Sequence, residues 1–337
     1  MRNQISDISM LMNLVKLTYL SVSYNQISDI SVLSNFTNLI ELYVLDNQIS
    51  NISSLSNLTG LTKLSLGQNL INDFSALMNL TNLTRLGLTN CQLTNIDVLS
   101  NLTNLTSLNL HSNELSDISA LGNLVNLTGL YIWGNEISDI SVLTNMAQLA
   151  DLQLNRNEIS NISSLAGLIN LEKVYLEYNQ ISDVTSFADL SNLKTVWLHH
   201  NQISDISSLA GLTNTTQLSI GNNPISNISA LSGLTEIYRL DAYSCQINDI
   251  SSLSNLSTLQ SVWLSSNQIS DISPLLNLVN LSNVKLDNNT ITDIKTLVDN
   301  TGIDNGDEVE LENNPLSEIS INIYIPQLEA RGVTVNQ

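Results

Sequence analysis

The histidines and one glutamate are the residues of this chain whose types could carry metal or acid–base chemistry. His199 and His200 are adjacent, and Glu177 lies 22 residues before His199. Imidazole and carboxylate groups both bind metals and carry protons. Neighbouring residues on a strand point to opposite sides unless a turn intervenes, however, and no third ligand is evident. We therefore interpret both histidines as polar contacts that titrate near about pH 6–7, without a catalytic or metal-binding role.

A repeat of 22 residues positions these histidines and nearly every other residue. Counting in steps of 22 from Asn3 reaches Asn289 with Asn at every step, except for Cys91 and Cys245. We call the residue at this spacing the ladder residue. Each copy, such as LYIWGNEISDISVLTNMAQLAD at 130–151, has alternating apolar residues followed by apolar residues at every third position. This change of spacing predicts a strand, a turn and a tight helical segment. Fixed self-similarity at this period is typical of a solenoid.

The residues between the apolar positions have structural roles of their own. A buried Asn amide can donate to and accept from the backbones of adjacent coils, as expected of the ladder residue in a leucine-rich repeat. Asp or Asn four residues later is expected to cap the helical segment. Ten residues after the ladder residue, at what we call the tenth position, Asn or Gly (Asp at 189 and 299) is expected to adopt a left-handed conformation that ends the helical segment. Thr215 replaces a core Leu or Ile, which predicts a local weakness and a bond from its hydroxyl to a neighbouring carbonyl.

The sequence therefore predicts an α/β fold: a right-handed leucine-rich-repeat solenoid with a curved parallel sheet on the concave face and short 3₁₀ or helical segments on the convex face. Residues 1–294 are expected to form about 14 repeats, the first incomplete, and residues 295–337 the last irregular repeat and a C-terminal cap. A helix is expected over Ser317–Arg331 and an edge strand over Val333–Val335. Because the sequence starts inside a repeat, we expect a longer protein or another domain covering that end.

The composition of the chain argues against several classes of binding partner. The net charge of −20, with only 11 Lys and Arg, argues against nucleic acid or an anionic membrane surface. No apolar run approaches the length of a spanning helix, so no membrane insertion is expected. The cysteines lie seven repeats apart, about 34 Å at the spacing of stacked strands, and are expected to be reduced and buried. No nucleophile–base pair, phosphate loop or metal spacing stands out, which predicts a protein that is not an enzyme and needs no metal or cofactor.

The run LxxLxLxxNxISDISxLxxLxN resembles the 22-residue repeats of the internalin family of bacterial surface proteins over nearly the whole chain. It resembles less closely the intracellular regulatory subunit of a eukaryotic protein phosphatase. The resemblance implies a curved solenoid that binds ligands on its concave sheet through residues outside the framework. The helical cap, immunoglobulin-like segment and wall anchor usual in internalins are not found in the sequence, so attachment and host-receptor roles are not carried over. Richness in Asn, Ser and Thr with little Lys favours an extracellular or cell-surface location.

Strand positions that point away from the core lie six, four, two and one residues before each ladder residue. They hold all three Trp, seven of nine Tyr and all three His. Aromatic residues suit strands in any case, but the three Phe fall in core positions, so the sequence separates aromatic types by exposure. Solvent-facing Trp and Tyr are residues that anchor interfaces. We predict a ligand-binding site formed by Tyr43, Tyr131, Trp133, Arg156, Tyr175, Tyr178, Trp197, His199, His200, Arg239, Tyr243, Trp263 and Lys285.

Three functions remain open. The first is a non-enzymatic protein that grips a protein or peptide on its concave face, where the densest stretch, from Tyr131 to Trp263, spans about 29 Å. The second is a glycan binder, because aromatic platforms also stack on sugar rings. The third is an intracellular regulatory subunit of a phosphatase. Near the C-terminus an acidic patch is expected to be a solvated cap face, with Ca²⁺ or a basic partner as the alternative; its members are Asp287, Glu308, Glu310 and Glu312.

Overall fold

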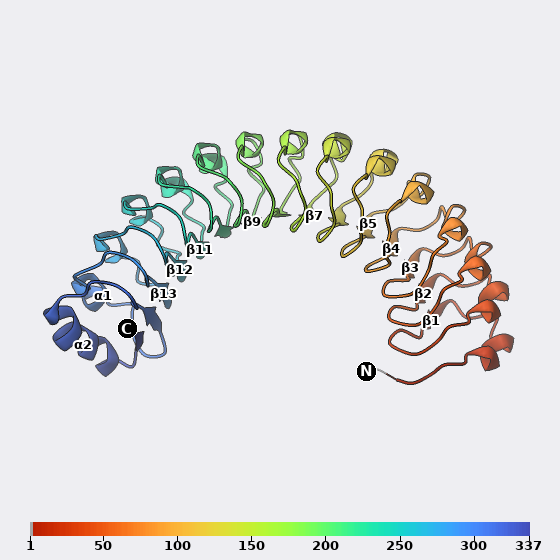
Figure 1. Ribbon diagram of the computed structural model, residues 1–337, viewed down its shortest axis with the longest axis horizontal. Coiled ribbons are helices and arrows are strands. Elements are labelled where there is room, and N and C mark those ends of the chain that lie inside the picture. Colours follow the sequence, from red (N-terminus) through yellow and green to blue (C-terminus); the bar gives the residue numbers. More distant parts are fainter. Residues whose placement is uncertain (1–2) are drawn as a thin grey trace. The chain divides into compact units, whose positions relative to one another are not determined.

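The computed structural model describes residues 3–337 of this 337-residue chain. The chain forms two compact units, of which the first ends at Ile159 and the second runs from Ser160 to Gln337. We refer to them as unit 1 and unit 2 and describe each by itself. In both units, a repeat forms one coil made of a strand, a turn and a short helical segment (Figure 1).

Unit 1 contains, within residues 3–159, seven three-residue strands that alternate with 3₁₀ segments. The strands are β1 (Tyr19–Ser21), β2 (Glu41–Tyr43), β3 (Lys63–Ser65), β4 (Arg85–Gly87), β5 (Ser107–Asn109), β6 (Gly129–Tyr131) and β7 (Asp151–Gln153). The 3₁₀ segments are η1 (Ser9–Asn13), η2 (Ser31–Asn35), η3 (Ser53–Leu55), η4 (Ser75–Leu77), η5 (Asp97–Leu99), η6 (Ser119–Asn123) and η7 (Ser141–Asn145). Successive strands pair in parallel, one repeat apart, as Tyr19 with Glu41.

Unit 2 contains eight strands in the described stretch from residue 160 onward. They are β8 (Lys173–Tyr175), β9 (Thr195–Trp197), β10 (Gln217–Ser219), β11 (Arg239–Asp241), β12 (Ser261–Trp263), β13 (Asn283–Lys285), β14 (Glu308–Glu310) and β15 (Thr334–Asn336). Between them lie η8 (Ser163–Leu165), η9 (Thr185–Phe187), η10 (Ser207–Gly211), η11 (Ser229–Gly233), η12 (Ser251–Leu253), η13 (Ser273–Leu275), α1 (Lys295–Asp299), η14 (Ser320–Tyr324) and α2 (Ile325–Ala330). All neighbouring strands pair in parallel, in chain order.

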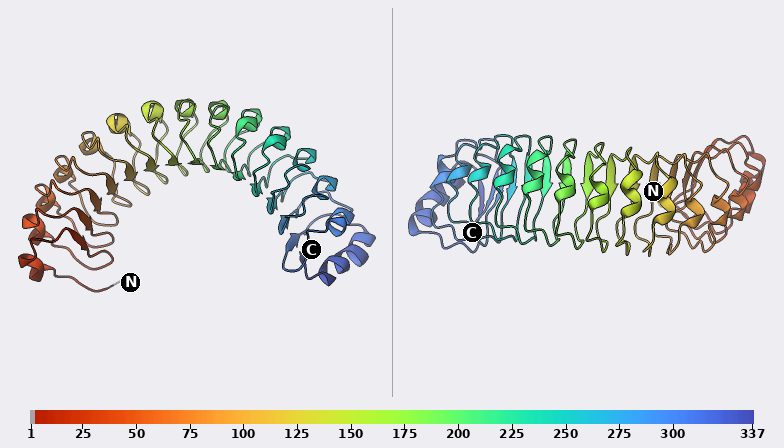
Figure 2. Two further views of the ribbon diagram at one scale, coloured as in Figure 1. Left: turned by 180° about the vertical axis from the view of Figure 1, so that it is seen from behind. Right: turned by 90° about the horizontal axis from the view of Figure 1, so that it is seen from above.

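The predicted α/β solenoid with a parallel sheet is confirmed. Within each unit the strands line the inner side of the curve and the helical segments line its outer side (Figures 1 and 2). The apolar residues of each coil point between these two layers, so Leu42, in the middle of β2, is fully buried. Phe36 and Phe187 are also fully buried, whereas Phe74 is partly exposed. None of the helices found in residues 3–337 is long and apolar enough to cross a bilayer.

The ladder residues bond as predicted. Asn47 accepts from the Ile27 N–H of the preceding coil at 3.0 Å, and its Nδ2 donates to the Val44 and Val22 carbonyls at 3.0 and 3.1 Å. Cys91 keeps only a weak version of this pattern, with Sγ 3.7 Å from the Leu66 carbonyl. Both Cys91 and Cys245 are free, and burial raises the pKa of the Cys91 thiol to about 11. Cys91 is buried as predicted, whereas Cys245 is half-buried, and both are free thiols at ladder positions.

The predicted caps are also confirmed. Asp29 Oδ1 accepts from the Ser31 N–H at 2.7 Å, and Asn51 makes the same bond to Ser53 at 2.9 Å. Accepting this backbone hydrogen bond holds the pKa of eight aspartates below the ordinary value of 3.8. They are Asp7, Asp29, Asp73, Asp117, Asp139, Asp183, Asp205 and Asp249.

The prediction of a left-handed residue at the tenth position is wrong. Positive φ angles occur instead at the residue before the ladder residue, as at Tyr24 (61°) and Asp46 (53°), because the chain reverses direction there after the strand. The helical segment ends without such a residue, and Phe36 just beyond η2 has φ −87°. A second set of amides joins the coils on another flank, where Asn38 Nδ2 donates to the Val15 carbonyl at 2.9 Å. Asn82, Asn104, Asn126, Asn192, Asn214 and Asn280 do the same.

The C-terminal elements largely follow the prediction. Helical structure occupies η14 and α2, with a π segment before Pro326, and Gly332 follows with φ +90°. The edge strand β15 begins at Thr334, one residue later than predicted. The Thr215 hydroxyl donates to the Leu193 carbonyl at 3.0 Å, which confirms the predicted bond of this buried side chain.

Candidate functional site

The outward side of the strands is the surface where side chains differ from coil to coil. In each three-residue strand the first and third side chains point away from the core, as Glu41 and Tyr43 do on either side of the buried Leu42, although neighbouring side chains cover some of them, such as Ser219 and Asp241. The two residues before each ladder residue extend this surface. We call these four positions of a coil its strand face. Because neighbouring strands are in register, Tyr175 lies opposite Trp197 and equivalent positions form rows across the strands.

A backbone turn brings adjacent strand-face residues to the same side. Tyr178 and His200 precede ladder residues and have φ angles of 58° and 56°. The ring centroids of His199 and His200 therefore lie only 5.7 Å apart. This is the intervening turn that the sequence left open for the two histidines.

Six rings from the strand face of unit 2 contact one another. We call this group the aromatic cluster: Tyr175, Tyr178, Trp197, His199, His200 and Tyr243. The Tyr178 ring stacks on His200 with centroids 4.2 Å apart, and Trp197 meets Tyr175 edge-on at 5.1 Å. Trp197 lies 6.0 Å from His199, and His200 lies 6.5 Å from Tyr243, so the contacts run from β8 to the end of β11. The structure thus brings together six of the predicted site residues.

Polar neighbours and one glycine hold the cluster in place. Ser219 Oγ lies 3.0 Å from His199 Nδ1, and Asn222 Nδ2 lies 3.2 Å from His200 Nε2. The Tyr243 ring covers Gly221, where an added Cβ would lie 2.6 Å from a ring carbon. Burial raises the pKa of the Tyr243 hydroxyl above its ordinary value. The rings are therefore positioned by their surroundings before any ligand arrives.

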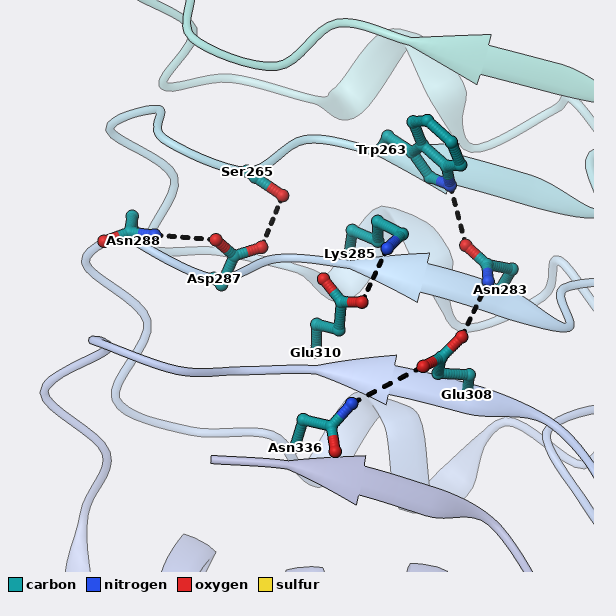
Figure 3. Close-up of polar contacts among 9 residues, drawn as sticks. All are labelled: Trp263, Ser265, Asn283, Lys285, Asp287, Asn288, Glu308, Glu310 and Asn336. Atoms are coloured by element: carbon teal, nitrogen blue, oxygen red, sulfur yellow. Dashed lines mark hydrogen bonds and ion pairs between the residues drawn. The ribbon is translucent and has the colours of Figure 1, made fainter.

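Trp263 has a different environment (Figure 3). Its ring centroid lies 4.3 Å from Arg239 Cζ and 5.1 Å from Lys285 Nζ, which are cation–π distances. Trp263 Nε1 donates to Asn283 Oδ1 at 2.7 Å, and Lys285 pairs with Glu310 at 2.6 Å. We call these residues, with Asp241, the Trp263 network. Here the indole is held by charged and polar side chains of the protein itself.

Asp241, like Asn283, belongs to this network but not to the predicted site. It is only 5% exposed, and Arg239 donates to both of its carboxylate oxygens, with Nε–Oδ1 at 3.1 Å and Nη2–Oδ2 at 3.0 Å. Burial raises its pKa, while the bonds from Arg239 act in the opposite direction. The spacing of 22 from Ser219 to Asp241 and on to Trp263 was the available signal.

The acidic patch near the C-terminus is engaged mostly by its neighbours (Figure 3). Glu308 accepts from Asn283 Nδ2 at 3.1 Å, and Asp287 accepts from the Ser265 hydroxyl and from Asn288 Nδ2. Over residues 3–337 no three His, Cys, Asp or Glu side chains are grouped so that they could hold a metal ion.

The remaining predicted residues belong to unit 1. Tyr43 donates its hydroxyl to Glu41 at 2.9 Å, and Trp133 stacks on His111 with centroids 4.1 Å apart. Burial lowers the pKa of His111 and raises that of Tyr131. Arg156 precedes a ladder residue, with φ 56°. These four predicted residues all lie on the strand face of unit 1.

Comparisons with known proteins agree with this architecture. The family described as Leucine Rich repeats (2 copies) matches residues 81–123, 169–211 and 257–299, and the family described as Leucine rich repeat matches residues 126–181. Together with the stacked coils, these matches define a leucine-rich-repeat protein. No curated protein matches the chain.

Similar solved structures indicate which family of leucine-rich-repeat proteins this chain resembles. An internalin (inlF) from Listeria monocytogenes is 38% identical, with 90% of this chain and 88% of that one covered and a TM-score of 0.83. The functional domain of InlJ from the same species is 23% identical over 94% and 72%, with a TM-score of 0.78. A leucine-rich-repeat protein of Leptospira interrogans is 21% identical over 100% of both chains, with a TM-score of 0.77. The chain belongs to the internalin family of leucine-rich-repeat proteins.

Proposed function

We propose that this protein is a non-enzymatic binding protein that holds a protein or peptide ligand on the strand face of unit 2. The observation that carries the proposal is the aromatic cluster: six rings touch one another outside the core, while most aliphatic residues of the same coils are buried. A soluble protein gains little from rings on its surface unless something covers them.

The physical properties of the cluster suit a protein ligand. Tyr and Trp provide large contact areas with few rotatable bonds, and they dominate the binding energy of many interfaces. Contacts between the rings, with Ser219 and Asn222 beside the histidines, reduce the ordering needed on binding. The two histidines add polar contacts within the apolar surface, which favours a specific partner.

Proteins of the same fold support a peptide-sized ligand. The plant peptide hormone receptor RGFR1 was solved in complex with RGF2; it is 23% identical to this chain, which spans 62% of that receptor, with a TM-score of 0.75. Identity at this level reflects the fold alone. Its bearing on the proposal is that a leucine-rich-repeat solenoid can take a peptide. Membership of the internalin family and the Asn-, Ser- and Thr-rich composition support an extracellular or cell-surface location.

The test is selection of binders from a displayed peptide library against the whole chain, followed by affinity measurement with the double variant Tyr175→Ala, Trp197→Ala. We expect the double variant to bind selected peptides at least about a hundredfold more weakly, a loss typical of two anchor residues. Tyr238→Ala is the matched control because Tyr238 is 37% exposed but lies outside the strand face. Equal binding by the double variant and the parent would refute this site.

A glycan array run in parallel tests the main alternative, a glycan ligand in place of a protein or peptide. Saturable glycan binding that is lost on Trp197→Ala, with no peptide selected, would replace the protein ligand by a glycan. The surroundings of Trp263 do not favour that outcome, because sugar stacking needs an open ring face and this ring already has two cations against it. Specific co-purification with a cytosolic phosphatase would instead contradict the proposed location.

A further inference from the structure

Arg85 on β4 of unit 1 carries a positive charge that no carboxylate in residues 3–337 pairs with directly. Its side chain is exposed, and within residues 3–337 its guanidinium makes no hydrogen bond or ion pair. Three other basic residues of the strand faces are paired: Lys63 with Glu41 at 2.8 Å, Arg239 with Asp241 at 3.0 Å and Lys285 with Glu310 at 2.6 Å. In a chain with 31 acidic residues, an unpaired arginine on this surface calls for a reason.

The placement of Arg85 is itself unfavourable. It lies directly opposite Lys63 on β3, and like charges at facing positions of adjacent strands destabilise a sheet. Glu41 relieves this only in part: its carboxylate makes its hydrogen bonds with Lys63 Nζ and the Tyr43 hydroxyl, which lower the pKa of Glu41 most, and the charge of Arg85 lowers it further. On the other side, β5 presents Ser107, which carries no charge. Two cations therefore stand side by side, and the nearest carboxylate of this row, Glu41, lies on the far side of Lys63.

Gly87, two residues after Arg85, has no side chain although the fold allows one. Its φ is not left-handed, and an added Cβ would meet only Ser65, at 3.5 Å or more. By contrast, a Cβ on Gly67 would lie 2.8 Å from the Thr89 carbonyl oxygen, so that glycine is required by packing. A glycine inside a strand weakens the strand and often marks the close approach of a ligand. The backbone of β4 is thus uncovered beside an unpaired guanidinium.

The neighbours of Gly87 complete the surface. Ser65 on β3 and Asn109 on β5 lie opposite Gly87 and offer short polar side chains. Two strands away on either side lie Tyr43 on β2 and Tyr131 on β6, and the charge of Arg85 acts on both hydroxyls. A group that reaches Gly87 would therefore meet hydrogen-bonding groups, with an arginine beside it.

We propose that Arg85 and Gly87 form a carboxylate-binding position on unit 1 that takes an aspartate or glutamate side chain from an extended segment of a protein ligand. The guanidinium matches a carboxylate with two parallel N–H donors. Absence of a side chain at Gly87 lets the ligand lie close to the sheet, and Lys63 adds a second positive charge. Because the chain carries a net charge of −20, two neighbouring cations also give an acidic segment a place where it is not repelled. The inference stands apart from the aromatic cluster of unit 2.

The experiment titrates the isotope-labelled whole chain with acetyl-hexaglutamate amide and follows the backbone amide signals of Ser65 and Gly87 by NMR. We expect saturable shifts that weaken at higher salt, while acetyl-hexaglutamine amide causes none. Arg85→Gln should weaken hexaglutamate binding at least about tenfold, as expected for loss of a charge-assisted pair. Lys194→Gln is the matched control, because Lys194 is an exposed, ion-paired cation of unit 2 outside the strand face.

Gly87→Val separates binding from folding. The site has room for a Cβ, and valine suits a strand, so the melting temperature should stay the same or rise while the hexaglutamate response is lost. Shifts at Ser65 and Gly87 that are unchanged in Arg85→Gln would overturn the proposal. So would Arg85-dependent binding of an oligoglucuronate without binding of hexaglutamate, which would make the ligand a glycan. The Tyr175→Ala, Trp197→Ala variant should respond like the parent, so the two proposals fail separately.

Discussion

The two sides of a coil in this protein follow opposite rules. The framework residues, by which we mean the ladder residues, the caps and the core, keep similar types and bonds from coil to coil, as Asn47 and Asn69 do, with Cys91 and Cys245 as the exceptions among the ladder residues. The strand face changes at every step. The row that starts at Tyr175 continues with Trp197, Ser219, Asp241, Trp263 and Lys285. Repetition marks the residues that hold the fold, and variation marks those that are free to recognise a ligand.

Low pH should cause the largest loss of stability on the framework side, because the eight capping aspartates titrate together. Their folded-state pKa values lie below 3.8, so protonation removes an interaction that only the ionised form makes fully. Stability is then complete above the ordinary pKa and is lost as the pH falls through the lowered values. We expect the melting temperature to be level from about pH 7 to pH 5 and to drop steeply below about pH 4.

The chain supplies a control for this effect, since several caps are Asn and do not titrate. Asn161 and Asn227 bond to the next helical segment as the aspartates do. The triple variant Asp183→Asn, Asp205→Asn, Asp249→Asn should therefore flatten the acid limb of the melting curve while keeping the caps. If the melting temperature of the triple variant fell at low pH as it does in the parent, carboxyl groups other than these three would cause the acid sensitivity.

Among single substitutions, loss of a ladder amide should have the largest effect. Asn267→Ala removes the acceptor of the Ile247 N–H and the donor to the Leu264 and Ala242 carbonyls, all buried. We expect the free energy of unfolding to fall by about 3 kcal/mol, measured by urea denaturation. Cys245→Asn should act in the other direction, by about 1 kcal/mol, because an amide oxygen is a better acceptor for the Ile225 N–H than the Cys245 sulfur or the Asn223 carbonyl, to which this N–H now donates at 2.8 Å. A loss below about 1 kcal/mol for Asn267→Ala would contradict the division drawn above.

Trp263 combines features of the framework and the strand face. It lies on the strand face, yet side chains of the protein itself hold its ring in place. Trp263→Ala removes two cation–π contacts, worth about 0.5–1 kcal/mol each, and the hydrogen bond to Asn283. We expect the free energy of unfolding to fall by about 1–2 kcal/mol in urea. Trp263→Phe should recover part of this loss, since it restores a ring but no donor.

Trp197 should show the smallest effect on stability. Its contacts with Tyr175 and His199 are half-exposed ring contacts without a charged partner. Trp197→Ala is expected to lower the free energy of unfolding by no more than about 1 kcal/mol, although it should weaken ligand binding strongly. A loss as large as that of Trp263→Ala would mean that the aromatic cluster supports the fold instead of a ligand.

The fold was predictable because every coil repeats the same solution. The 22-residue spacing gives the parallel register directly, and the types of residue at the ladder and cap positions imply their bonds. The left-handed residue was misplaced because its position carries no common residue type: Tyr24, Asp46 and Gln68 all occupy it. The second amide set, at Asn38 and its equivalents, did carry a signal, since Asn recurs there at the same period.

The strand face was predictable in position but only partly in contacts. Spacing alone placed Tyr175, Trp197 and Trp263 on one row, and the structure agrees. It could not distinguish a ring that packs on other rings from one held by Arg239 and Lys285, because that depends on side-chain conformations across several strands. Arg85 and Gly87 were not among the predicted site residues for a related reason, since an unpaired charge is visible only when its neighbours are known.

The uniform length of the coils has a consequence for how such a chain can change. Strands pair at a constant offset of 22 residues from β1 to β7 and again from β8 to β13. Gene duplication or loss of one whole repeat within either stretch would preserve every core position while adding or deleting one column of recognition residues. The 25-residue step from Asn283 to Glu308 breaks this interchangeability. Growth by recombination is therefore confined to the regular coils, and the C-terminal end must be inherited intact.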